Sequence, residues 1–237
     1  MKIPVLYYHK IDNPEKNAVL KGLYVTPSQF EMQMKILKFL GFSTITPDDL
    51  LFFLKGHKMQ VRKPVVITFD DGYENNYIHA FPILKSYGFT ATVFISTRFI
   101  GRKNAVLEEK GKESWPEDFL GEKEILELSD YGITIGSHGL NHYFLDELEK
   151  NVVAKELIAS KAYLEGFLKK NVCFFSYPYG RYNANVMEAV KNAGYKGAFT
   201  TGRGKVAAYD NAFELKRIPV NGYNTVFNFL YKIIFLQ

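Results

Sequence analysis

Short apolar runs alternate with longer amphipathic segments along most of the chain, and this alternation is the main indicator of its fold. Residues 64–69 form a short, largely β-branched run, which is typical of a parallel strand buried on both faces. The same reasoning predicts seven strands, at residues 3–8, 64–69, 89–95, 133–136, 172–177, 197–201 and 214–220.

Capping residues between these runs indicate where helices begin. Thr26 is followed by Pro27 and Gln29, so the sequence offers an N-cap, a first-turn proline and a capping box. Thr46 and Pro47 begin a second helix in the same way. Further helices are expected up to residue 87 and at residues 122–131, 146–169, 184–193 and 226–236.

Strands that alternate with helices predict a parallel sheet with the helices outside it. At 237 residues, a closed or nearly closed (β/α) barrel fits better than an open doubly wound sheet. No linker or internal repeat divides the chain, so we predict one domain over residues 1–237 with an α/β fold. Residues 98–120 interrupt the alternation with many charges and Trp115, and are expected to form a long surface loop.

The composition excludes several classes of protein. Apolar residues make up 47% and charged residues 23%, as in a soluble globular chain, which excludes disordered, collagen-like and coiled-coil proteins. The single cysteine, Cys173, excludes an intramolecular disulfide and a cysteine-rich zinc site. The net charge of +5 comes without a basic stripe, so we expect no nucleic-acid partner.

Targeting signals are not evident in the sequence. The first residues lack the long apolar core and the cleavage site of a secretory signal, so a native N-terminus would place the protein in the cytoplasm. No stretch approaches the roughly 18 apolar residues of a membrane span. The aromatic tail at residues 226–236, interrupted by Lys232, has two interpretations: a final helix packed on the domain, or a peripheral membrane contact.

Candidate chemistry gathers at the predicted strand ends. A parallel barrel places its site at the carboxyl ends of its strands. His9 follows the first predicted strand, Asp70 and Asp71 follow the second, and His138 and His142 follow the fourth. The other two histidines, at positions 57 and 79, are expected to lie on the surface.

These residue types suit metal-assisted hydrolysis. Two imidazoles and one carboxylate form a three-ligand set that leaves a coordination position open for water. A bound metal lowers the pKa of that water from about 15.7 to about 7, which favours hydroxide by roughly 12 kcal/mol. A second carboxylate, free of the metal, can take the proton as general base. Asp70 and Asp71 supply one carboxylate for each role.

Each motif alone also has a purely structural interpretation. Asp-Asp-Gly after a strand is common turn chemistry. A histidine pair four residues apart is a moderate metal signal, and here glycines place it in a loop. Residues 177–180, Tyr-Pro-Tyr-Gly, could be a simple turn. Together, at successive strand ends, the three motifs favour a functional site.

The sequence resembles the polysaccharide deacetylases, the NodB homology group of carbohydrate esterase family 4. The resemblance runs from about residue 3 to residue 220. Its motifs are Thr-Phe-Asp-Asp-Gly at 68–72, Ser-His-Gly-Leu-Asn-His at 137–142 and Tyr-Pro-Tyr-Gly at 177–180. The opening, Leu-Tyr-Tyr-His-Lys-Ile at 6–11, is similar to the branch that contains poly-N-acetylglucosamine deacetylases.

The resemblance implies a distorted parallel (β/α) barrel of about seven strands that removes acetyl groups from sugars with the help of a metal. It implies that Asp70 is the catalytic base and that Asp71, His138 and His142 are the metal ligands. The backbone N–H of Tyr179 would help to stabilise the oxyanion. Zinc is the expected cofactor, and cobalt, nickel or iron would also suit these ligands.

The sequence departs from the family at two positions. Ser176 replaces the arginine that orients the catalytic aspartate in many members, and Arg217 is a candidate substitute, against the alternative of a surface ion pair. The late histidine that protonates the leaving amine is missing. His9 is therefore the candidate general acid, with a purely structural role as the alternative.

Three residues are candidates for contact with the substrate. They are Tyr177, Arg217 and Trp115, whose indole either stacks on a sugar ring or holds its own loop in place.

The sequence thus predicts a metal-dependent hydrolase that removes N-acetyl groups from an N-acetylated sugar or polysaccharide, with a metal-bound water as nucleophile. Two alternatives remain. One is deacylation or deformylation of a lipid-linked sugar, or of another small amide, on the same metal site. The other is a carbohydrate-binding barrel without catalysis. Substrate identity and oligomeric state are left open.

Overall fold

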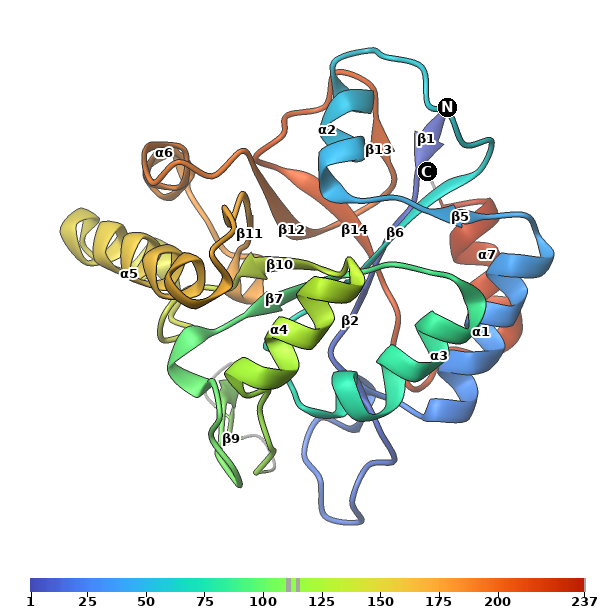
Figure 1. The fold of residues 1–237 in the computed structure, drawn as a ribbon, viewed down its shortest axis with the longest axis horizontal. Helices are drawn as coiled ribbons and strands as arrows, with labels where there is room; N and C mark the ends of the chain where they lie inside the picture. The colour runs from blue at the N-terminus through green and yellow to red at the C-terminus, as the bar shows by residue number, and fades with distance from the viewer. Residues whose placement is uncertain (110–111, 114–115, 237) are drawn as a thin grey trace.

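Seven parallel strands form a closed ring at the centre of the molecule (Figure 1), as the sequence predicts. The computed structural model describes residues 1–109, 112–113 and 116–236. In sequence order around the ring, the strands are β2 (Val5–Tyr8), β6 (Pro64–Phe69), β7 (Thr92–Ile95), β10 (Thr134–Ser137), β11 (Phe174–Ser176), β12 (Gly197–Arg203) and β14 (Leu215–Pro219). Pairing of β2 with both β14 and β6 closes the barrel.

Seven α-helices in the described part of the chain surround the ring (Figure 1). Their bounds are α1 (Pro27–Phe39), α2 (Pro47–Leu54), α3 (Phe81–Tyr87), α4 (Glu122–Tyr131), α5 (Lys150–Leu168), α6 (Ala184–Asn192) and α7 (Val226–Ile234). The capping boxes predicted at Thr26 and Thr46 are present, and each threonine hydroxyl accepts a hydrogen bond from a first-turn N–H. No helix among the described residues combines the length and the apolar character needed to cross a bilayer.

Shorter elements connect the barrel to its surroundings. The two-residue strands are β1 (Lys2–Ile3), β3 (Lys10–Ile11), β4 (Tyr24–Val25), β5 (Ser43–Thr44), β8 (Glu108–Glu109), β9 (Lys112–Glu113) and β13 (Val206–Ala207). The short helical turns are η1 (Lys21–Leu23), η2 (Asn76–Ala80), η3 (Thr97–Phe99), η4 (Leu145–Glu147) and η5 (Pro178–Gly180). Of these, η2 has π-helical geometry and leads directly into α3.

Two apolar clusters divide the core, and strand pleating decides which residue enters which cluster. Along β7, Val93 and Ile95 pack outward against the helices, whereas Phe94 points into the barrel. Side chains of a strand alternate between its two faces, so every second residue fills the lumen. One part of the lumen is filled by apolar side chains: Val5, Val66, Phe94, Phe174, Phe199 and Leu215. It is therefore a packed core rather than a channel.

The segment at 98–120 is more structured than the expected surface loop. Leu107 and Phe119 are buried and pack with Tyr73 in a small apolar cluster of their own. Isolated bridges pair Tyr73 with Phe119 and Ala105 with Glu117. The many charges of this segment predict a surface loop, but two of its apolar residues, Leu107 and Phe119, anchor it to the barrel. Trp115 lies outside the described residues.

The C-terminal helix α7 packs on the domain through one face only. Phe229 and Ile233 are buried in the main apolar cluster. Phe227, Tyr231 and Phe235 are exposed. The structure thus confirms the packed final helix, and the peripheral membrane contact stays a prediction that concerns the exposed face.

Candidate active site

The strand register brings the predicted site residues together at one end of the barrel. Phe69 at the end of β6 pairs with Val93 of β7, and Ile95 of β7 pairs with Ser137 at the end of β10. The ladder continues one residue further. The backbone N–H of Asp70 donates to the Tyr8 carbonyl (3.0 Å), and that of His138 donates to the Ile95 carbonyl (2.9 Å). The backbone beneath both side chains is therefore fixed by the sheet.

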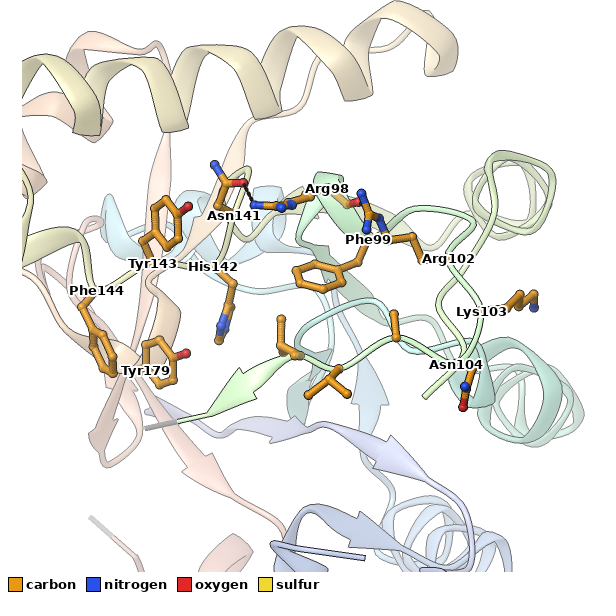
Figure 2. A pocket seen from close by; sticks show the side chains of 13 residues that line it. Arg98, Phe99, Arg102, Lys103, Asn104, Asn141, His142, Tyr143, Phe144 and Tyr179 are labelled. Carbon is orange, nitrogen blue, oxygen red and sulfur yellow. Dashed lines mark hydrogen bonds between the residues drawn. The ribbon is translucent and has the colours of Figure 1, made fainter. Parts of the chain in front are cut away.

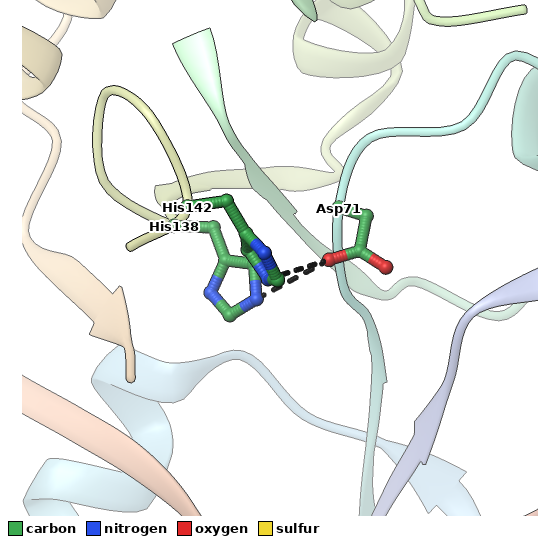
Figure 3. A group of neighbouring side chains, drawn as sticks. All are labelled: Asp71, His138 and His142. Carbon is green, nitrogen blue, oxygen red and sulfur yellow. Dashed lines mark ion pairs between the residues drawn. The ribbon is translucent and has the colours of Figure 1, made fainter. Parts of the chain in front are cut away.

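Asp71, His138 and His142 form a buried cluster of three potential metal ligands (Figure 3). Oδ1 of Asp71 lies 3.4 Å from Nε2 of His138 and 3.3 Å from Nε2 of His142. Zinc bonds of 2.0–2.1 Å in a tetrahedral arrangement separate neighbouring ligand atoms by about 3.3–3.4 Å. These donor distances therefore fit a tetrahedral cation.

Hydrogen bonds and charge favour ligation by this cluster. Nδ1 of His138 donates to the Ser176 carbonyl at 2.7 Å, which directs Nε2 towards Asp71. Burial by itself would raise the pKa of Asp71, but hydrogen bonds from His138 and His142 outweigh it and hold that pKa well below its usual range. Burial lowers the pKa of His142, which favours the neutral imidazole that ligates metals.

Three residues of the site adopt a left-handed backbone conformation, which is unusual for residues other than glycine. The φ angles are 76° at Asp71, 60° at His142 and 59° at Tyr179. Left-handed conformations of non-glycine residues are sparsely populated and cost of order 1 kcal/mol or more each. The surrounding fold therefore stabilises this geometry, and such strain is concentrated at functional sites.

Asp70 points into the barrel lumen and is not one of the three candidate ligands. It lies on the same face of the chain as Val66 and Thr68, two and four residues before it. Arg217 meets it there: Nη1 donates to Oδ1 at 2.8 Å and Nη2 donates to Oδ2 at 2.7 Å. Burial by itself would raise the pKa of Asp70, but the charge and hydrogen bond of Arg217 and the neighbouring His138 together outweigh burial and hold that pKa below its usual value.

Arg217 is fully buried, and each of its donor nitrogens is satisfied. Besides Asp70, it donates to the Thr200 carbonyl (2.8 Å), the Thr68 hydroxyl (3.2 Å) and the Ser176 hydroxyl (3.0 Å). These contacts use all five N–H groups of the guanidinium. The alternative of a surface ion pair is therefore excluded. Arg217 reaches Asp70 from β14, and the small Ser176 side chain is one of its hydrogen-bond partners.

His9 follows β2, the strand that pairs with β6, and therefore lies next to Asp70 at the barrel mouth. It is half-buried and lines a cavity of about 580 Å³ together with Tyr7 and residues of α7. Burial lowers its pKa, while the nearby carboxylates of Asp71 and Asp70 oppose that effect. His57 and His79 lie elsewhere: His57 stacks on Phe52, and Nε2 of His79 is 3.7 Å from Asp12.

The turn Tyr177–Gly180 contributes differently from what the sequence suggests. The backbone of Tyr179 lies at this turn, and its ring packs 4.5 Å from His142 and 4.0 Å from Phe144. Tyr177 is fully buried, and its hydroxyl donates to the Phe213 carbonyl. A contact between Tyr177 and a substrate does not fit this placement, because the side chain lies beneath the turn. The same holds for Arg217, which no substrate reaches directly.

Sequence reasoning missed Glu156, a buried carboxylate on α5. Its Oε2 accepts the backbone N–H groups of Leu140 (3.2 Å) and Asn141 (2.9 Å), and its Oε1 accepts the Asn141 side chain. Glu156 thereby holds the loop that carries both histidines. Its place in a long amphipathic helix gave no signal, because only the tertiary structure brings α5 to this loop.

A comparison with family models identifies the family of the chain. The polysaccharide deacetylase model matches residues 57–198, which include Asp70, Asp71, His138 and His142. The chain belongs to the polysaccharide deacetylase family. The matched range also contains the strands β6, β7, β10 and β11.

Individual polysaccharide deacetylases and related structures extend over nearly the whole chain. YxkH of Bacillus subtilis is 33% identical over 220 residues, which cover 93% of this chain and 72% of that protein. The poly-β-1,6-N-acetyl-D-glucosamine N-deacetylase of Staphylococcus aureus is 31% identical over 85% of this chain and 69% of its own length. The structure of the Streptococcus pyogenes deacetylase PplD superposes with a TM-score of 0.84, at 29% identity and 98% coverage of both chains.

Proposed function

We propose that this polysaccharide deacetylase removes N-acetyl groups from N-acetylated sugar units, with a divalent cation held by Asp71, His138 and His142. The observation that carries the proposal is that two carboxylates adjacent in the sequence have different partners. Asp71 faces two imidazoles at cation-ligand spacing, whereas Asp70 faces Arg217. Zinc fits these donors best by charge and geometry, and cobalt, nickel or iron also suit them.

Each residue has a defined part in the proposed hydrolysis. A bound cation would polarise the acetyl carbonyl and lower the pKa of an adjacent water. Arg217 uses one lone pair on each oxygen of Asp70 and leaves others to accept the proton of that water. The lowered pKa keeps Asp70 ionised near neutral pH. The backbone N–H of Tyr179 would stabilise the negative oxygen of the tetrahedral intermediate.

We assign protonation of the leaving amine to His9. The reaction also needs a proton donor for the leaving amine. His138 and His142 are committed to the metal cluster, and His57 and His79 are held by Phe52 and Asp12. His9 is the remaining histidine, and its side chain reaches a cavity at the barrel mouth.

The decisive experiment is acetate release from N-acetylglucosamine oligomers before and after treatment with a chelator. We expect activity to vanish on chelation and to return with zinc or cobalt. Asp70→Asn should lower kcat by about 10²–10⁴-fold and keep the metal, because it removes the base but no ligand. Asp71→Asn should lose metal and activity together. Asp48→Asn, an exposed aspartate on α2, is the matched control.

Other outcomes distinguish the alternatives. Release of a different acyl group from the same metal-loaded protein would replace N-acetylated sugar as the substrate. Metal binding without turnover of any acyl sugar would mean that the barrel only binds carbohydrate. For His9, we expect His9→Gln to lower kcat and to remove one limb of the pH–rate profile. An unchanged profile would leave the proton donor to another group.

A further inference from the structure

A second cavity, of about 690 Å³, opens directly beside the metal cluster (Figure 2). His142 and Tyr179 line one part of it, and Arg98, Arg102 and Lys103 line another. Its size lies in the range of small-molecule and oligosaccharide sites. Among the side chains that the structure describes, which do not include those of residues 108–115, the charged ones that line this cavity are all cationic.

The two arginines are available to a ligand, and the lysine is not. Lys103 is engaged by Glu74 at 2.5 Å and by Asp118 at 3.6 Å. Arg98 and Arg102 are exposed, and among the described side chains, those of residues 108–115 excepted, neither has a carboxylate at ion-pair distance. Each uses one donor atom inside the protein. The remaining N–H groups of both guanidiniums can therefore bind an external acceptor.

Arg98 is tied to the metal-ligand loop by a chain of hydrogen bonds. Its Nη1 donates to Oδ1 of Asn141 at 3.0 Å (Figure 2), and Asn141 lies between the two histidine ligands in sequence. The Asn141 side chain in turn donates to the buried Glu156. This chain fixes the guanidinium relative to His142 before a ligand arrives, which lowers the entropic cost of binding.

Arg102 is held next to Arg98 by a contact of its own. Its Nε donates to the Arg98 carbonyl at 2.8 Å, so its Nη atoms remain to face the cavity. The opposite end of the cavity is aromatic, with Tyr143, Phe144 and Tyr179 (Figure 2). The cavity thus combines an apolar end for sugar rings with a cationic end, and the metal cluster lies along its wall.

We propose that Arg98 and Arg102 bind an anionic group, a carboxylate or a phosphate, on the unit next to the N-acetylated sugar. The preferred substrate is then an acidic N-acetylated glycan rather than a neutral one. The planar guanidinium fork matches both oxyanions, and charged hydrogen bonds of this kind are about twice as strong as neutral ones. This inference rests on the proposed function and specifies the substrate class of the same site.

The test compares three sets of N-acetylglucosamine oligomers: neutral, with a neighbouring carboxylate, and with a neighbouring phosphate. We expect kcat/KM of the wild-type protein to be at least tenfold higher for one or both acidic sets. The double variant Arg98→Gln/Arg102→Gln should lose that preference. Arg62→Gln removes an exposed arginine just before β6, at the opposite end of the barrel, and should keep it.

Binding measurements separate failure of this inference from failure of the proposed function. With Asp70→Asn protein, which should turn over its ligand about 10²–10⁴-fold more slowly, acidic oligomers should bind at least tenfold more tightly than neutral ones, less so at high salt. If the acidic preference in binding persists without any deacetylation, the proposed function is wrong and the anion site stands. Equal kcat/KM and equal affinity for neutral and acidic oligomers would overturn the anion site alone.

Discussion

Arg217 of β14 and Asp70 after β6 form a bidentate ion pair inside the barrel, although 147 positions separate them in the sequence. Both side chains point into the lumen, and both are almost completely shielded from water. In many members of the family an arginine of the third motif orients this aspartate, and here Ser176 occupies that position. The arginine that holds the aspartate therefore comes from a different strand.

Loss of Arg217 should be costly for stability as well as for catalysis. We expect Arg217→Met to lower the free energy of unfolding by about 3–5 kcal/mol, because it leaves the buried Asp70 without its counter-charge. Denaturant unfolding at pH 7 measures this change. The double variant Arg217→Met/Asp70→Asn should recover part of the loss, since no buried charge remains unpaired. An unchanged unfolding midpoint for the single variant would contradict the buried pair.

Glu156 should act on the metal through the loop that it holds. Glu156→Gln replaces one accepting oxygen with an NH₂ group, so either the backbone N–H groups of Leu140 and Asn141 or the Asn141 side-chain amide loses its acceptor. We expect zinc affinity to fall by about 10–100-fold, as for other residues that orient metal ligands. Titration against a competing chelator measures it. Glu188→Gln on the exposed side of α6 is the control, and equal affinities in both variants would reject this role.

A metal held by the folded site should stabilise the fold. At a free zinc concentration 100 times the dissociation constant, the gain is about 2.7 kcal/mol. For a chain of this size, that corresponds to a rise in Tm of roughly 5–10 °C. Asp71→Asn should abolish the rise, and His57→Gln on the surface should keep it. A rise that survives Asp71→Asn would place the metal elsewhere.

Tyr195 should make the fold sensitive to alkaline pH. Burial raises the pKa of Tyr195 to about 12, and its hydroxyl donates to the Leu157 carbonyl. Its contribution to stability is therefore fully present below pH 10, the ordinary tyrosine pKa, and is lost as the pH rises towards 12. We expect a loss of about 2–3 kcal/mol in unfolding free energy over this range.

The variant Tyr195→Phe isolates this effect. It should be about 1 kcal/mol less stable than wild type at pH 7, because the hydrogen bond is lost. Between pH 10 and 12 its stability should fall less steeply, whereas Tyr209→Phe, at an exposed position, should keep the wild-type slope. Identical slopes for Tyr195→Phe and wild type would show that Tyr195 does not control this transition.

The secondary structure and the barrel could be predicted from the sequence because their signals are local. The capping threonines at 26 and 46 and the apolar run at 64–69 each depend on a few neighbouring residues. The strands at 89–95 and 172–177 are shorter in the structure than predicted, since their outer residues continue beyond the sheet. The proximity of Asp71, His138 and His142 followed from one rule, that parallel strand ends meet at one end of a barrel.

Several features of the site required the tertiary structure. Tyr177 and Tyr179 belong to one turn, yet only the fold shows that the first is buried, with its hydroxyl bonded to the Phe213 carbonyl, and that the second packs on His142. In the sequence, Arg98 and Arg102 belong to a charged segment that is expected at the surface. Only the structure shows that both line the cavity beside His142.

The sequence by itself therefore determined the strands, the helices and the residues at the strand ends, because periodicity and capping act over a few residues. Only the tertiary structure decided that Arg217 holds Asp70, that Glu156 holds the histidine loop, and that two arginines face the cavity. Those relationships depend on the closure of the barrel and on the rotation of each strand and helix about its own axis. Pairing across such distances leaves no periodic signal in a single sequence.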